Sequence, residues 1–141
     1  DKLGKIANLF NRDGGPTPPV GISVPKAMYD DFVEICKPIK EINPEYPFEV
    51  TVAQPRKKPT TMGGTDASVF AVKGVPTYGF REQDFKGYNF NYGEIWHTER
   101  DLYTKSIPEY MEHTSVVTAV VALGVANLKK QLSREGMYSD Q

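Results

Sequence analysis

Three short segments contain the residues whose types and spacing suit metal binding or catalysis. In one, His97 follows Trp96 within an aromatic-rich stretch and precedes several carboxylates. Such a histidine is a candidate metal ligand or general base; the alternative is a structural histidine bonded to a nearby carboxylate. In another, Asp13 follows a short apolar run and precedes two glycines. If that run is a buried strand, Asp13 lies where α/β folds place ligands, although an ordinary Asp-Gly turn explains the sequence equally well.

The third segment is Gly63-Gly64-Thr65-Asp66, which precedes a predicted short helix. Free N–H groups at such a position could bind an anion, but a plain helix cap formed by Thr65 or Asp66 explains the residues equally well. The segment matches neither the dinucleotide fingerprint nor the phosphate-binding loop of nucleotide hydrolases. We therefore do not expect nucleotide binding.

Two further residues with reactive side chains favour structural roles. His113 follows Glu109 by four residues on a predicted helix, which indicates a surface ion pair. Cys36 is the one cysteine of the chain, so an internal disulfide is excluded. Its place in an apolar helical pattern predicts a buried free thiol.

Alternating strands and helices are expected to position these residues. The apolar spacing of Met28, Phe32, Ile35, Cys36 and Ile39 predicts an amphipathic helix over 25–41. Ser106-Ile107-Pro108-Glu109 has the form of a capping box and begins a helix expected to reach about residue 133. The other expected elements are strands at 5–11, 20–24, 48–53 and 75–80, a helix at 66–73 ended by Gly74, and a long aromatic loop at 81–105. This alternation predicts an α/β fold.

Composition excludes several classes of protein. The chain has 141 residues, the usual size of one domain, and carries 17 Lys and Arg against 18 Asp and Glu, for a net charge of −1. Without a basic excess, nucleic-acid binding is not expected. The apolar stretch 116–128 is too short to cross a bilayer, so we predict no transmembrane segment.

Four motifs in order resemble the C-terminal half of the two-zinc exopeptidase family. They are Asn11-Arg12-Asp13, the segment 63–70 that begins Gly63-Gly64-Thr65-Asp66, Gly74-Val75-Pro76, and the segment 96–101 that begins Trp96-His97. The family includes bacterial leucyl aminopeptidases, glutamate carboxypeptidase and plasma glutamate carboxypeptidase. The resemblance extends over roughly residues 5–133.

The resemblance implies roles for particular residues. Asp13 would be a terminal ligand of one zinc ion and His97 a terminal ligand of the other. Trp96 would lie beside the substrate, and Asp101 would be a carboxylate that orients the ligands. Thr65-Asp66 would shape the substrate side of the cleft. The chain departs from the family at Ala67, where many relatives have histidine, which affects substrate contacts and not the metal ligands.

The resemblance also implies a fold and an incomplete site. The expected fold is a three-layer α/β sandwich with a mostly parallel sheet flanked by helices, of which residues 1–141 would form the C-terminal part. The general base and the carboxylate that bridges the two zinc ions would lie in an N-terminal part absent from this chain. We therefore expect no catalytic residue here and no activity from the chain alone.

The expected partners follow from the same resemblance. They are a peptide substrate and the missing N-terminal half, and the apolar surface that this half would cover favours self-association. Ile6 to Phe10 and the apolar face of the helix at 106–133 are the surfaces concerned. A periplasmic or secreted location is favoured by the resemblance only.

Several activities remain open on this fold. Aminopeptidase activity is the broader activity of the family, whereas Arg81 could bind a substrate carboxylate and would favour a carboxypeptidase. A glutaminyl cyclase shares the fold with a single zinc ion. The transferrin receptor ectodomain is similar in fold and binds protein without catalysis. The sequence upstream of the chain would separate these alternatives.

Overall fold

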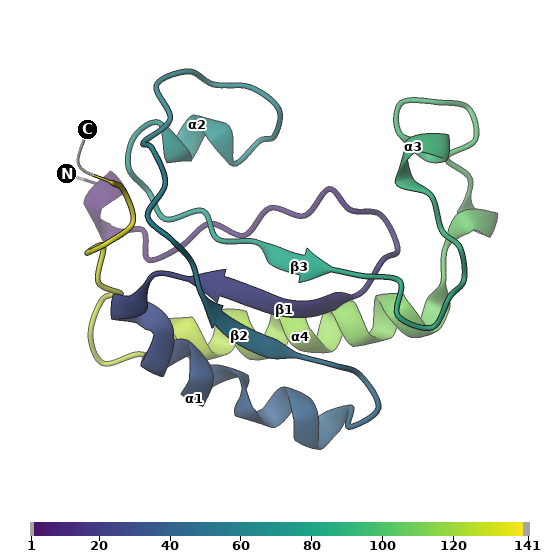
Figure 1. Ribbon diagram of the computed structural model, residues 1–141, viewed down its shortest axis with the longest axis horizontal. Coiled ribbons are helices and arrows are strands. Elements are labelled where there is room, and N and C mark those ends of the chain that lie inside the picture. The colour runs from purple at the N-terminus through teal and green to yellow at the C-terminus, as the bar shows by residue number, and fades with distance from the viewer. Residues whose placement is uncertain (1, 140–141) are drawn as a thin grey trace.

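A three-stranded mixed sheet forms the centre of the computed structural model, which describes residues 2–139. The middle strand β1 (Pro19–Val24) pairs in parallel with β2 (Glu49–Val52) and antiparallel with β3 (Phe80–Glu82), so the strand order is β2-β1-β3 (Figure 1). The α/β class is therefore confirmed. The sheet of the described residues is evenly mixed, with one parallel and one antiparallel pair.

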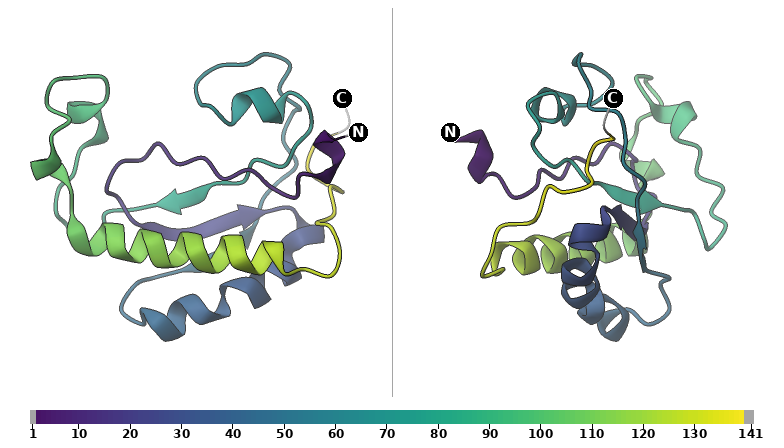
Figure 2. Two further views of the ribbon diagram at one scale, coloured as in Figure 1. Left: turned by 180° about the vertical axis from the view of Figure 1, so that it is seen from behind. Right: turned by 60° about the vertical axis from the view of Figure 1, so that its left-hand side comes forward.

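Two long helices lie side by side against one face of this sheet (Figures 1 and 2). The apolar residues that predicted α1 (Lys26–Ile42) form its buried face, and Met28, Phe32 and Ile39 are completely buried. The second helix, α4 (Pro108–Ala126), approaches α1 closely at Gly124, where a Cβ atom would lie 2.5 Å from Ile35 Cγ2. Glycine at this position allows the two helices to pack closely.

The ends of α4 differ from the predicted ends. The N-cap is Ile107, the Ser106 hydroxyl donates to the Tyr103 carbonyl, and the Glu109 carboxylate bonds to other side chains, so the capping-box prediction is wrong. The helix ends at Ala126 instead of near residue 133. The chain turns away because Leu132 and Met137 are buried in the core, which residues on a continued straight helix would not reach.

The chain after α4 fixes the N-terminal segment. The Arg134 guanidinium donates to the carbonyl oxygens of Gly74 at 3.1 Å, Ile6 at 3.0 Å, and Leu3 and Gly4 at 3.3 Å. Nη1 donates to Gly74, whereas the two hydrogens of Nη2 are shared among the carbonyl oxygens of residues 3, 4 and 6. Residues 3–6, a short 3-10 helix and its C-cap, are thereby held beside the turn at Gly74.

The strand predicted at 5–11 is wrong because no strand forms there, and of the strand predicted at 75–80 only Phe80 lies in β3. The Leu9 N–H donates to the Pro76 carbonyl at 2.8 Å, so the two segments do run side by side. Next to this bond, however, the Asn8 carboxamide accepts from the Tyr78 N–H at 3.2 Å and donates to the Tyr78 carbonyl at 3.4 Å. The Asn8 side chain thus makes the hydrogen bonds that the backbone of a paired strand would make. Pro76 has no N–H with which to continue backbone pairing. Only β3 becomes a strand in this region.

Two small helices rise above the sheet at opposite ends (Figure 1). α2 (Ser68–Ala71) is shorter than the predicted helix at 66–73, and Gly74, with φ +77°, ends this region as expected. α3 (Tyr92–Ile95) and a 3-10 helix at Tyr103–Lys105 lie inside the segment predicted as a long loop. None of the described helices combines the length and the apolar character needed to cross a membrane.

His113 is buried, so the predicted surface ion pair with Glu109 is wrong. Its ring is 1% exposed and stacks on Tyr46 with the ring centroids 4.0 Å apart. Nε2 lies 3.2 Å from the Pro19 carbonyl oxygen and therefore donates to it, while Nδ1 lies 2.9 Å from Asn43 Nδ2 and can accept from it in the neutral ring. The neutral imidazole thus joins α4 to β1 and to the end of α1.

We expect this histidine to make stability depend on pH. Burial lowers the pKa of His113 below its ordinary value, although the Pro19 carbonyl and Glu45 oppose the shift. Because the unfolded chain then binds the proton more readily, stability is fully present above the unfolded pKa of about 6.5 and is lost as the pH falls below it. Denaturant unfolding at pH 7.5 and at pH 5.5 should show the loss. His113→Gln, whose amide can still donate to Pro19, should reduce it. Equal pH dependence in both proteins would contradict this expectation.

The free thiol of Cys36 is buried within α1, as predicted. Its side chain is 5% exposed, and burial raises the pKa of the thiol to about 12. A thiol with such a pKa is not a nucleophile at neutral pH.

Candidate functional site

Asn11 joins two of the predicted site residues directly. Its Nδ2 lies 2.7 Å from Asp13 Oδ2 and 2.8 Å from Thr65 Oγ1, and the two hydrogens of the amide allow both bonds. Asp13 and Thr65, which are far apart in the sequence, are therefore held together. Asp13 does not end a central strand, as the sequence predicted, but lies in an extended segment outside the sheet.

Arg12, the neighbour of Asp13, is committed to an ion pair. Its Nε lies 2.8 Å from Glu82 Oε1 at the end of β3, and the guanidinium also donates to the Thr17 carbonyl. The pKa of the Glu82 carboxyl is raised above its ordinary value, because the effect of burial exceeds the opposing effect of Arg12. A Cβ atom at Gly14 would overlap the Glu82 carboxylate, so glycine is required beside this ion pair. The turn after Asp13 is thereby fixed to β3.

The segment 63–66 forms an exposed wall with its own local bonds. Gly63 and Gly64 have positive φ values of 147° and 79°, and the Gly63 N–H donates to Ser68 Oγ at 2.9 Å. Thr65 and Asp66 are exposed, but neither caps α2, whose N-cap is Ala67 without a side-chain bond. The predicted helix cap is therefore wrong, and Thr65 bonds to Asn11 instead.

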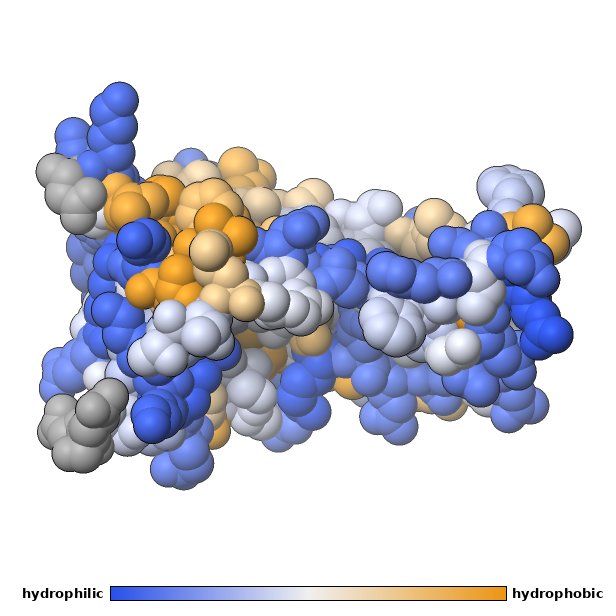
Figure 3. Space-filling model, turned by 90° about the horizontal axis from the view of Figure 1, so that it is seen from above, coloured by the Kyte–Doolittle hydropathy of each residue, from blue (hydrophilic) through white to orange (hydrophobic). Residues whose placement is uncertain are grey.

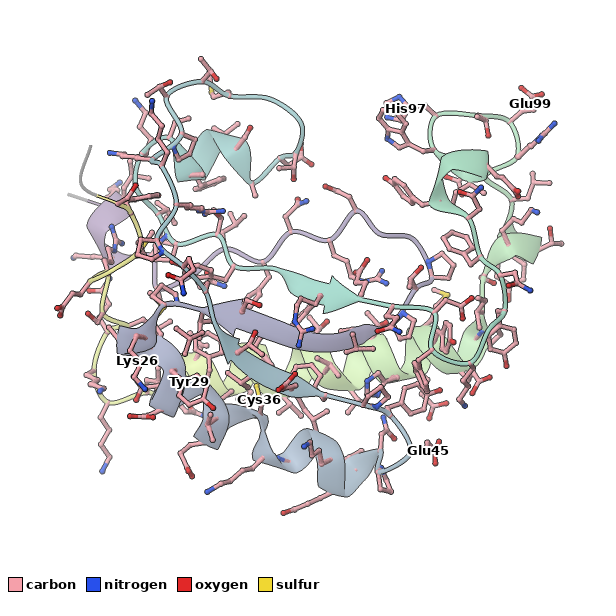
Figure 4. All side chains as sticks on the ribbon, viewed as in Figure 1. Lys26, Tyr29, Cys36, Glu45, His97 and Glu99 are labelled. Atoms are coloured by element: carbon pink, nitrogen blue, oxygen red, sulfur yellow. The ribbon has the colours of Figure 1, made fainter. Side chains whose placement is uncertain are left out.

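His97 lies on a tight turn directly after α3. Its φ of +56° is in the left-handed region, which is uncommon for residues other than glycine. The Thr98 hydroxyl lies 2.8 Å from the Glu94 carbonyl oxygen, and the Asp101 N–H donates to the Thr98 carbonyl at 3.3 Å, which closes the turn. The His97 and Trp96 ring centroids are 4.7 Å apart. Figure 4 shows the imidazole directed toward the end of the molecule where α2 lies.

These segments surround one large cavity of about 1180 Å³. Six of the seven predicted site residues line it: Asp13, Thr65, Asp66, Trp96, His97 and Asp101. They come from the N-terminal segment, from the wall before α2 and from the turn after α3. The structure therefore brings together residues that the sequence placed in three separate motifs.

Arg81, the seventh predicted site residue, lies outside the cavity. Its guanidinium is 3.5 Å from the Glu49 carboxylate on β2. To reach β2, the side chain passes over Gly21 of β1, where a Cβ atom would overlap the guanidinium. Side chains alternate between the faces of a strand, and Arg81 therefore points away from its neighbour Glu82, which lies on the Arg12 side.

Asp13 and His97 have side chains that can bind zinc, but two ligands are too few for a catalytic zinc site. Carboxylate and imidazole are ordinary zinc ligands, and a catalytic zinc takes about three protein ligands with a water molecule. Among residues 2–139, no group of three or more His, Cys, Asp or Glu side chains is arranged to hold a metal ion. The described residues therefore do not form a metal site by themselves.

A polar network that the sequence did not reveal fixes the segment leading to α3. Glu109 of α4 accepts from Lys86 and Tyr88, and from the Tyr46 hydroxyl at 3.0 Å. The hydrogen bond from the Lys86 ammonium is the main cause that lowers the pKa of Glu109 to about 2. The carboxylate therefore stays charged in the pH range in which histidine titrates.

Asp84 forms the second part of this network. It accepts from the Tyr110 hydroxyl at 2.7 Å and from the N–H groups of Tyr88 at 3.0 Å and Phe90 at 3.4 Å. The bond from Tyr110 is the main cause that lowers the pKa of the Asp84 carboxyl. Because two of its partners are backbone groups of a loop and the third is a side chain on α4, neither periodicity nor a motif indicated them. The signal in the sequence was only the density of aromatic residues in 81–105.

No family model, curated protein or solved structure matches this chain.

Proposed function

We propose that the chain contributes part of the active site of a zinc-dependent exopeptidase of the aminopeptidase type. The observation that supports the proposal is that Asp13 and His97 line one cavity together with Thr65, Asp66, Trp96 and Asp101. The order of these residues in the sequence resembles the two-zinc exopeptidases, and the cavity gathers the residues to which that resemblance gives a role.

In this proposal, Asp13 and His97 each hold one of two zinc ions. When bound, the ions supply an activated water molecule and polarise the scissile carbonyl group. Asn11 fixes the Asp13 carboxylate through its amide, and the turn closed by Thr98 directs the His97 imidazole. Trp96, whose ring centroid lies 4.7 Å from that of His97, offers a flat apolar surface to the substrate.

The number of ligands requires further residues. Two ligands cannot complete two zinc sites that take about three protein ligands each. We therefore propose that a bridging carboxylate, a general base and the remaining ligands come from a preceding polypeptide. This polypeptide would complete a three-layer α/β sandwich with a mostly parallel sheet. We refer to the chain together with it as the complete enzyme.

The position of Arg81 does not support the carboxypeptidase alternative. Arg81 was the candidate for binding a substrate carboxylate, and it is paired with Glu49 outside the cavity. The glutaminyl-cyclase alternative differs in the number of metals, and the protein-binding alternative requires none.

An activity assay of the complete enzyme tests the proposed function. We expect chelator-sensitive release of nitroaniline from aminoacyl-nitroanilides and no release when the amino group of the substrate is acetylated. Equal hydrolysis of acetylated substrates, or hydrolysis that survives removal of metal, would contradict the aminopeptidase assignment.

The 141-residue chain alone is expected to be inactive. It should hydrolyse neither aminoacyl-nitroanilides nor dipeptides, even with added zinc, because the general base and the bridging carboxylate are proposed to lie elsewhere. The measurement is absorbance of released nitroaniline over several hours, with the complete enzyme as the positive control. Chelator-sensitive turnover by the isolated chain would show that the described residues contain a sufficient site.

We further propose that the isolated chain associates with itself or with the preceding polypeptide. A groove of about 550 Å³ is lined by Phe10 of the N-terminal segment and by Val125 and Leu128 near the end of α4. Leu123, on α4, is 64% exposed. Uncovered apolar surface of this kind favours contact with a partner. Sedimentation over a concentration series should show association, and a concentration-independent monomer would contradict it.

A further inference from the structure

The exposed apolar side chains of the protein are concentrated at the candidate site. Within residues 2–139, eleven large apolar side chains are exposed, and seven of them line the cavity. Met62 and Val69 lie on the α2 side and Met111 on α4, and the four on the α3 side are Tyr92, Trp96, Leu102 and Tyr103. Figure 3, seen from above, shows apolar side chains gathered over the α2 end with a smaller group at the α3 end. Exposed apolar surface gathered in this way marks a binding site.

The types of these side chains indicate a broad preference for apolar ligands. Methionine is flexible and polarisable, so Met62 and Met111 can adapt to ligand side chains of different shape. Trp96 and Tyr103 provide rigid, flat surfaces for aromatic or branched side chains. The volume of about 1180 Å³ exceeds the range of about 300–1,000 Å³ that is typical of small-molecule sites. The cavity therefore suits several residues of a peptide.

The charges around the cavity disfavour acidic ligands. Both cationic side chains that line the cavity have an acidic neighbour: Arg12 forms an ion pair with Glu82 at 2.8 Å, and Lys105 lies 3.9 Å from Glu94. In the part of the chain that the structure describes, Asp66 on one wall has no ion pair. The same holds for Asp101 on the opposite wall. A carboxylate entering between these walls meets like charge on both sides.

We propose that the cavity binds peptides with apolar or aromatic side chains at their first residues and discriminates against peptides with acidic side chains. The inference rests on the proposed function, because it names the substrate class of the same site. It places the chain apart from the glutamate-specific members of the family that the sequence resembles. The discrimination comes from Asp66 and Asp101, and the affinity comes from the apolar walls.

The fluorescence of Trp96 offers a direct test, because it is the one tryptophan of the chain. We would titrate the 141-residue chain, without metal, with the amides of Leu-Phe-Leu and Glu-Phe-Glu at constant ionic strength. The apolar peptide should bind at least about tenfold more tightly, which corresponds to about 1.4 kcal/mol. Asp66→Asn combined with Asp101→Asn should strengthen binding of the acidic peptide relative to the apolar peptide, because both peptides carry the same N-terminal ammonium group and differ only in their side chains.

A matched pair of variants tests the contribution of the walls. Met62 is 66% exposed and lines the cavity, whereas Leu123 is 64% exposed and lies on α4 outside it. Met62→Ser should weaken binding of the apolar peptide about tenfold, the effect of losing one buried apolar side chain, and Leu123→Ser should leave peptide binding unchanged. Circular dichroism should show that both variants fold, so that a change in binding can be assigned to the side chain.

The outcomes separate this inference from the proposed function. Equal or tighter binding of the acidic peptide, or no change in Trp96 emission with either peptide, would overturn the inference whatever the metal content. Zinc-dependent hydrolysis by the complete enzyme with a preference for acidic peptides would support the function and overturn the inference. Selective binding of the apolar peptide without hydrolysis by the complete enzyme would support the inference and contradict the function.

Discussion

Replacement of His97 by alanine is expected to reduce kcat/KM of the complete enzyme at least about a hundredfold. The reason is that one of two zinc ions loses a protein ligand in a site where each ion has few. The imidazole is exposed in the cavity and makes no interaction with the core, so the variant should fold normally. The measurement is steady-state hydrolysis of an aminoacyl-nitroanilide with zinc content determined on the same sample.

Glu99→Ala is the matched control for His97→Ala. Glu99 is exposed on the same turn, two residues further along, and does not line the cavity (Figure 4). Its removal should change kcat/KM by no more than about twofold, the usual range for a surface substitution. Equal effects of the two substitutions would show that the loop as a whole matters and that the imidazole has no special role.

Replacement of Arg134 by methionine is expected to destabilise the fold by about 3 kcal/mol. Methionine keeps the length of the side chain and removes all of its donors, so the carbonyl groups of residues 3, 4, 6 and 74 lose their shared partner. The measurement is chemical denaturation followed by circular dichroism. Because Asn11 and Asp13 belong to the same N-terminal segment, amide exchange of residues 6–13 should also accelerate.

Arg100→Met is the control for this effect. Arg100 is exposed on the turn after His97, and its guanidinium has no hydrogen bond or ion pair within residues 2–139. Its substitution should change the free energy of unfolding by less than about 0.5 kcal/mol. A loss of stability no greater for Arg134→Met than for Arg100→Met would contradict the role given to the guanidinium.

Local patterns in the sequence predicted the elements that depend on local physics. The apolar spacing in 25–41 predicted α1 almost to its ends, because a long amphipathic helix is stabilised by one continuous buried face. The alternation in 48–53 predicted β2 in the same way. The strands at 5–11 and 75–80 failed because the side chain of Asn8 replaces the backbone ladder, which no periodicity reveals.

The sequence predicted the short motifs that form the site but only some of the contacts that hold these motifs together. Thr65-Asp66 and Trp96-His97 were recognised as local motifs, but the bond from Asn11 to Thr65 that fixes one wall joins residues far apart in the sequence. Arg81 was misplaced because its role depended on which face of β3 it occupies. The burial of His113 likewise depends on Tyr46 and on the Pro19 carbonyl, which lie on other elements.

Anomalous diffraction at the zinc absorption edge, from crystals of the complete enzyme, tests the central claim most directly. The claim is that Asp13 and His97 are ligands of two different zinc ions in one cavity. We expect two peaks about 3.5–4 Å apart, the usual spacing of two-metal sites, one beside the Asp13 carboxylate and the other beside the His97 imidazole. Zinc bound elsewhere, with either side chain free of metal, would contradict the account.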